Sequence, residues 1–67
     1  MSHHGIDAVY VALDGRPVTW LARQLGVTRA VIYRWAHGDR VSRERAADIE
    51  RVLGVPASSL FPNVEDE

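Results

Sequence analysis

Apolar residues along this chain recur with the spacing of α-helices, and glycines separate the segments that carry that spacing. In the first segment, over residues 6–13, the apolar residues stand at i, i+3, i+4 and i+7 and predict one apolar helix face: Ile6, Val9, Tyr10 and Leu13. The Asp14-Gly15 pair that follows is interpreted as a helix stop. A hairpin turn is disfavoured because the flanking residues keep the helical period.

Capping residues mark three further helices. A helix over residues 18–25 follows a proline, which is tolerated in the first helical turn. A second helix spans residues 28–37, with Thr28 as its N-cap. A third spans residues 42–53, with Ser42 as its N-cap. The glycines that follow the four helical segments are expected to act as C-terminal caps: Gly15, Gly26, Gly38 and Gly54.

The length of the chain limits it to one small domain, because 67 residues bury only a modest core. The pattern predicts an all-α fold, a compact four- to five-helix bundle over residues 1–62. A short helical turn over residues 57–60 lies near the end of this unit, and residues 63–67 are expected to form a frayed acidic tail. The chain has no cysteine, which excludes disulfides, thiol catalysis and cysteine-ligated zinc.

Residues 21–35 contain two short helical patterns that meet at Gly26. Glycine can take the positive φ that a tight turn between helices needs, and Ala22 is small where the two helices must cross closely. Val27 and Ile32 stand at the two positions of a hydrophobic staple. The predicted core of this helix pair consists of Leu21, Ala22, Leu25, Gly26, Val27, Ile32 and Trp35.

This helix pair resembles the helix-turn-helix of DNA-binding regulators, in which the second helix, here residues 28–37, enters the major groove. More widely, residues 16–61 resemble the Cro/CI-type family of phage and bacterial repressors. Residues 35–38 (Trp-Ala-His-Gly) resemble that family's stop after the second helix. Residues 53–55 (Leu-Gly-Val) and 60–61 (Leu-Phe) resemble its later segments. The resemblance implies a regulator that binds a double-stranded DNA operator and controls transcription without covalent chemistry.

The predicted recognition helix, residues 28–37, has two faces. Ile32 and Trp35 face the core by their spacing, so the residues on the opposite side face outward. Arginine can contact guanine through two hydrogen bonds, alanine can touch a thymine methyl, and a tyrosine hydroxyl can reach a phosphate or base edge. The candidate base-reading residues are Arg29, Ala30, Tyr33 and Arg34.

Candidate phosphate contacts lie at the ends of this helix and after it. Thr28 begins the helix, and His37 ends it on the outward face. The resemblance implies that the following loop contacts the DNA backbone, which makes Arg40 and Arg43 phosphate candidates. Many family members begin the first helix of the motif with Thr-Gln, where the glutamine contacts phosphate. The sequence at residues 17–18 is Pro-Val, which leaves that contact in doubt.

The net charge of −1 argues against nucleic acid binding until its distribution is considered. Residues 16–45 hold seven arginines against Asp39 and Glu44, which makes this block +5, and the flanking segments are acidic. A basic block with acidic flanks is found in small DNA binders. Charge alone equally fits a solvated surface rich in arginine.

Other classes of function find little support in the sequence. No serine–histidine–aspartate set, paired carboxylates or phosphate loop is present, so no catalytic residues, no cofactor and no metal site are expected. His3-His4 is interpreted as a sequence accident or a tag remnant. No apolar run approaches the length of a membrane span, and a secretory signal is lacking. We therefore expect a cytoplasmic protein, either in the bacterial host cell at large or associated with the nucleoid.

Three alternatives concerning partners and function stay open: an antitoxin-type regulator, a homodimer and an excisionase-like protein. An antitoxin-type regulator would bind a protein through Trp20 or the C-terminal end, although Trp20 is also explained by packing onto a neighbouring helix. A homodimer on a two-fold operator is the second, and its C-terminal apolar candidates are Leu60, Phe61 and Val64. An excisionase-like architectural protein is the third. It is disfavoured because such proteins carry a strand or wing where residues 42–53 are predicted to be helical.

Overall fold

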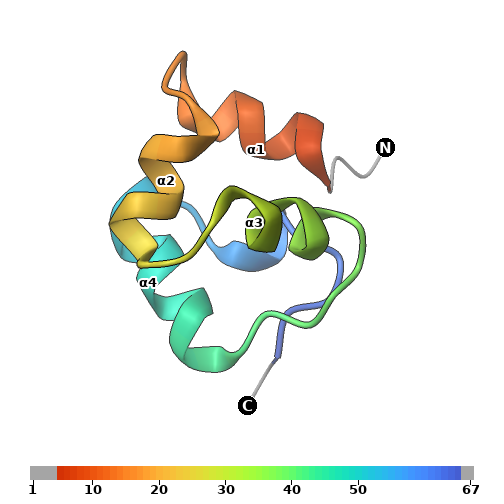
Figure 1. Cartoon of the computed structure of the whole chain (residues 1–67). Coiled ribbons are helices and arrows are strands. Elements are labelled where there is room, and N and C mark those ends of the chain that lie inside the picture. Colours follow the sequence, from red (N-terminus) through yellow and green to blue (C-terminus); the bar gives the residue numbers. More distant parts are fainter. Residues whose placement is uncertain (1–4, 66–67) are drawn as a thin grey trace.

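Four α-helices and one short 3₁₀ helix make up the computed structural model, which describes residues 5–65 (Figure 1). The elements in chain order are α1 (Ile6–Leu13), α2 (Val18–Leu25), α3 (Arg29–Ala36), α4 (Arg43–Leu53) and η1 (Ala57–Ser59). These bounds agree closely with the helices predicted from the sequence, and the all-α fold class is confirmed.

The starts of α3 and α4 are fixed by side-chain caps, as predicted. The Val31 amide donates to Oγ1 of Thr28 at 3.4 Å, and the Arg45 amide donates to Oγ of Ser42 at 3.2 Å. Each bond adds a side-chain acceptor for an amide of the first helical turn, and the Val31 amide also donates to the Thr28 carbonyl at 3.1 Å. Short local motifs of this kind explain why these helix bounds can be read from the sequence.

The turn between α2 and α3 depends on Gly26, which has a φ of 73°. The next amide, that of Val27, reaches back to the Ala22 carbonyl at 2.9 Å and closes a Schellman-type C-cap. A residue with a Cβ rarely adopts this left-handed φ. Gly26 therefore ends α2 and lets α3 follow after a very short connection.

The end of α1 differs in detail from the prediction of a glycine cap. Asp14, and not Gly15, is the first left-handed residue, with a φ of 53°. The Asp14 amide bonds to carbonyls of the last turn, and the Arg16 Nε donates to the Leu13 carbonyl at 2.8 Å. The arginine thus supplies a terminal hydrogen bond at the C-terminal end of α1, where a positive charge is also favoured by the helix dipole.

The core lies where α2 packs against α1, α3 and α4. Figure 1 shows α1 and α4 at opposite ends of α2, with α3 beside it. The largest fully buried side chains are Phe61, Leu13, Leu21, Ile32, Ile49, Val9 and Val41. Of the residues predicted for the core of the helix pair, five are buried: Leu21, Ala22, Leu25, Ile32 and Trp35. Val27 is half-buried against them, and Gly26 is exposed at the turn.

The predicted apolar face of α1 is wrong at Tyr10. The structure buries Ala8 together with Val9 and Leu13, whereas Tyr10 is 49% exposed. Nearly every residue of α1 is apolar, so the helical period alone does not select one face over its neighbour. The packing of α1 against α2 and α3 makes that selection.

The prediction of a frayed tail is wrong for residues 63–65, which we call the C-terminal strap. Val64 forms a parallel β-bridge with Val41. The Val41 amide donates to the Asn63 carbonyl at 2.8 Å, and the Glu65 amide donates to the Val41 carbonyl at 2.8 Å. These bonds satisfy backbone groups around the fully buried Val41, and so they hold the strap against the body of the domain.

The C-terminal apolar residues considered for dimerisation contribute to the fold. Leu60 and Phe61 are buried, and Val64 is half-buried in the strap. The ring of Phe61 meets that of Trp35 edge to face, with centroids 5.7 Å apart. The Gly5 amide, just before α1, donates to the Leu60 carbonyl at 2.7 Å. Both ends of the described chain are therefore tied to the core.

Ala22→Leu is expected to lower the free energy of unfolding by about 1–3 kcal/mol, because a larger side chain overpacks the helix crossing. Ala22 is 5% exposed on the buried side of α2, which contacts α3 and α4. Gln24→Leu is the matched control, since Gln24 lies on the same helix and is exposed. It should change stability by less than about 0.5 kcal/mol. Thermal melts that rank the two variants equally would contradict the packing described for Ala22.

Candidate nucleic-acid interface

Helix α3 presents two chemically distinct faces. Ile32 and Trp35 are buried and anchor the helix to the core. The residues predicted to face outward are exposed at four positions, Arg29, Ala30, Arg34 and His37, whereas Tyr33 is half-buried. Thr28, the N-cap, is also exposed, and its hydroxyl retains a donor while its oxygen caps the helix. The structure thus places the predicted contact residues of this helix on its outward side.

Arg34 has an acidic neighbour that the sequence reasoning missed. Its Nε lies 3.7 Å from Oδ2 of Asp39, and both side chains are exposed. The Asp39 amide donates to the Arg34 carbonyl at 3.0 Å, which places the carboxylate near the guanidinium. An exposed ion pair contributes little to stability. Asp39 therefore biases the position of the Arg34 side chain while leaving the guanidinium able to exchange partners.

Tyr33 is paired with an aromatic side chain from α1. Its hydroxyl lies 3.5 Å from the hydroxyl of Tyr10, and either oxygen can be the donor. The hydrogen bond with Tyr33 is the main cause that raises the pKa of Tyr10 above its ordinary value. Sequence reasoning placed Tyr10 on the same apolar face as Val9 and Leu13, so it missed this contact between α1 and the recognition helix.

The loop between α3 and α4 carries the two predicted phosphate arginines. Arg40 lies within it and Arg43 begins α4, and both are exposed. The C-terminal strap holds this loop at two points besides Val41. The Asn63 side-chain amide donates to the Gly38 carbonyl at 3.1 Å, and a Glu65 carboxylate oxygen accepts from the Arg43 amide at 3.1 Å. The strap therefore holds the backbone on both sides of Arg40, at Gly38 and at Arg43.

Two arginines of the basic block serve the fold. Arg45, on α4, donates to the Leu25 carbonyl at 2.6 Å and so satisfies the end of α2. Arg16 bonds to the end of α1 and also stacks its guanidinium on the Trp20 ring, 4.1 Å from the centroid. Trp20 is half-buried against the core, which confirms the packing interpretation of this residue. The other five arginines of the block are all exposed: Arg23, Arg29, Arg34, Arg40 and Arg43.

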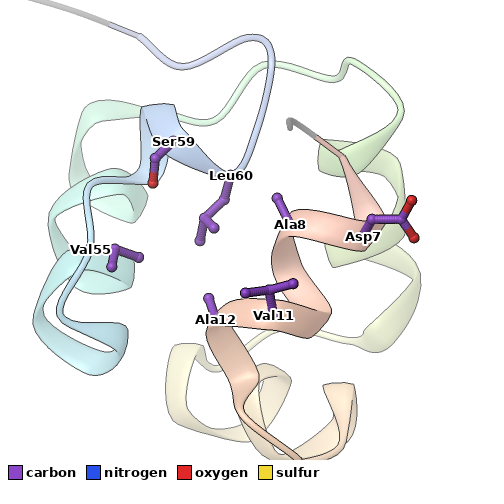
Figure 2. Close-up of a pocket in the computed structure, with 7 residues that line it drawn as sticks. All are labelled: Asp7, Ala8, Val11, Ala12, Val55, Ser59 and Leu60. Carbon is purple, nitrogen blue, oxygen red and sulfur yellow. The ribbon is translucent and has the colours of Figure 1, made fainter. Parts of the chain in front are cut away.

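A groove of different character lies between α1 and the segment that follows α4 (Figure 2). Its volume is about 470 Å³, and its lining is apolar except for Asp7 and Ser59. Val11, at its edge, is 79% exposed. None of the candidate DNA-contacting residues lines this groove. The basic surface, by which we mean the surface that carries Arg23, Arg29, Arg34, Arg40 and Arg43, is therefore separate from the apolar groove.

Neither a metal site nor a membrane-spanning helix is found in the described part of the chain. Within residues 5–65, no three histidine, cysteine or acidic side chains gather in a way that can hold a metal ion. No helix in that range has the length and apolar character needed to cross a bilayer. The pair His3-His4 lies outside the described residues.

Comparison with known proteins identifies a family. A family model described as helix-turn-helix matches residues 18–60, which is more than half of the chain. The matched segment runs from the first residue of α2 to Leu60, just after η1, and so includes both helices of the motif and the loop with Arg40 and Arg43. Searches among curated proteins and among solved structures give no match.

Proposed function

The chain belongs to the helix-turn-helix family, and on that premise we propose that it is a repressor of the Cro/CI type that occupies a DNA operator. Membership of the family makes it a sequence-specific DNA-binding protein of transcription regulation. We further propose that the regulator is of phage or prophage origin and that it represses transcription. We also propose which of its residues contact DNA. Its mechanism is non-covalent, because an occupied operator denies the polymerase access to the promoter.

The observation that carries the proposal is the arrangement of α3. Ile32 and Trp35 fix the helix to the core, and Arg29, Ala30 and Arg34 project from its other side. In the helix-turn-helix docking mode this side enters the major groove. Each arginine there is suited to the O6 and N7 acceptors of guanine, and the small Ala30 allows close approach to a thymine methyl.

We assign the contacts that set register and affinity to the ends of this helix. Thr28 begins α3, and His37 follows its last residue. Arg40 and Arg43 extend the basic surface along the loop that the C-terminal strap holds. Contacts of this kind go to phosphates, so they position the protein without reading the sequence. A regulator that acts in this way works on the bacterial chromosome, and we place it in the cytoplasm, associated with the nucleoid.

The proposal is tested on an operator selected from a pool of randomised duplexes. Arg29→Ala and Arg34→Ala are each expected to weaken binding to this operator by about 1–3 kcal/mol and to relax the preference at one base pair. Arg40→Ala and Arg43→Ala should weaken binding to the operator and to random duplex alike. Titrations of the four variants against both DNAs provide the measurement.

Two results would count against this assignment. If all four variants lose operator and random binding in parallel, Arg29 and Arg34 do not read bases. If selection recovers no preferred sequence, a sequence-specific repressor is excluded. The selected sequence also tests the homodimer that we include in the proposal, because a pair of two-fold-related subunits recovers two half-sites about one helical turn apart.

A further inference from the structure

Tyr10 occupies an unusual position for a large aromatic side chain. It lies on α1, outside the matched helix-turn-helix segment, and it is 49% exposed. Helix α1 nevertheless contacts α3, and the Tyr10 hydroxyl lies 3.5 Å from that of Tyr33 across 23 residues of sequence. Among residues 5–65, Tyr10 is the residue of α1 whose side chain forms a hydrogen bond with the recognition helix.

When two hydroxyls bond to each other, one O–H group and three lone pairs are left for other partners. Each hydroxyl has one donor hydrogen and two acceptor lone pairs. A bond between them uses one donor and one lone pair, so one O–H remains free to point outward. The oxygen that accepts within the pair is the one whose hydrogen is free. Because hydrogen bonds in a chain polarise one another, accepting a bond strengthens that oxygen as a donor.

We propose that Tyr10 is a positioning residue for DNA recognition, which donates its hydroxyl hydrogen to Tyr33 and leaves the Tyr33 hydrogen to bond an acceptor on the DNA. This inference rests on the proposed function. The direction follows from the elements involved, since Tyr33 belongs to the helix that is proposed to enter the groove. The DNA acceptor is a phosphate oxygen or a base-edge oxygen or nitrogen, and both present lone pairs to a donor.

Positioning matters because Tyr33 is only half-buried. Among residues 5–65, its hydroxyl has no hydrogen-bond partner besides Tyr10. Without that partner, the phenolic hydrogen is free to rotate and must be ordered when DNA binds. The pair sets the hydrogen's direction in the free protein, which reduces the ordering needed on binding. The DNA interface thereby extends from the helix-turn-helix onto α1.

A cycle of hydroxyl deletions tests the inference. Tyr10→Phe is expected to weaken binding to the selected operator by about 3- to 10-fold, the range for one neutral hydrogen bond. In the Tyr33→Phe background, the second change Tyr10→Phe should have no further effect, because the only group that it positions is gone. Val11→Ala, at the adjacent and more exposed position of α1, is the control that should leave affinity unchanged.

The other outcomes overturn the inference. No loss in Tyr10→Phe means that the hydroxyl does not act in recognition. Equal losses in both backgrounds mean that Tyr10 contacts DNA independently of Tyr33. If the unchanged protein binds no duplex DNA at all, the proposed function fails and the inference fails with it. Melting curves of each variant show that the fold is retained.

Ultraviolet titration of the tyrosines in free protein separates the pairing from DNA binding. Tyr33→Phe should lower the pKa of Tyr10 towards its ordinary value, because the bond with Tyr33 is the main cause that raises it. An unchanged Tyr10 titration would show that the two hydroxyls are not bonded in solution, which overturns the positioning role even if the protein binds its operator. This measurement needs no ligand.

Discussion

Phe61→Ala is expected to lower the free energy of unfolding by about 3–5 kcal/mol, which is much of the total stability of a domain this small. Phe61 is 1% exposed and has the largest of the fully buried side chains. Its removal leaves a cavity in the core and takes the edge-to-face partner from Trp35, which anchors the recognition helix. Urea or thermal unfolding followed by circular dichroism provides the measurement.

Two further variants serve as controls for this result. Phe61→Leu keeps an apolar side chain of substantial volume in the site and is expected to cost clearly less than the alanine change. Val11→Ala removes two methyl groups from a side chain that is 79% exposed, so it should change stability by less than about 0.5 kcal/mol. If Phe61→Ala unfolds at the same denaturant concentration as Val11→Ala, the core described around Phe61 is wrong.

Operator affinity is expected to fall by about 250- to 1,000-fold when the salt concentration rises from about 50 to 200 mM. This range corresponds to a slope of log K against log salt of about −4 to −5, which follows when roughly five phosphates are neutralised. The five arginines of the basic block other than Arg16 and Arg45, whose side chains bond to helix ends, supply that number of charges. Fluorescence anisotropy at a series of salt concentrations measures the slope.

Single arginine variants give this measurement its internal control. Arg40→Ala should make the slope less steep by about one, because one fewer counterion is released. Arg45→Ala should leave the slope nearly unchanged if the domain remains folded, since Arg45 is bonded to the Leu25 carbonyl at the end of α2. Affinity that stays constant across the salt range would contradict a phosphate-contacting basic surface.

Most of the helix bounds could be predicted from the sequence because local chemistry sets them. Thr28 and Ser42 cap the helices that follow them through bonds to amides three residues away. Gly26 ends α2 through its own backbone conformation. The outward face of α3 could be predicted for a similar reason, since two anchors, Ile32 and Trp35, determine which side of a short helix faces the core.

The features that the sequence did not predict depend on contacts between distant residues. The strap pairs Val64 with Val41, and no local pattern marks that pairing. Arg45 bonds a carbonyl 20 residues away, so counting charges along the chain overstates the number available for DNA. In α1 the apolar residues surround the helix, and the side that becomes buried is decided by its neighbours and not by its period.

The division of α3 into anchors and outward residues has a consequence for the divergence of such regulators. Substitutions at exposed positions usually change stability by less than about 0.5 kcal/mol, so Arg29, Ala30 and Arg34 can be exchanged with little threat to folding. Under the proposed assignment of these residues as base readers, a lineage acquires a new target sequence by changing them while Ile32 and Trp35 stay fixed. Substitution of Tyr33 is expected to be tolerated less well, because it also removes the hydrogen-bond partner of Tyr10.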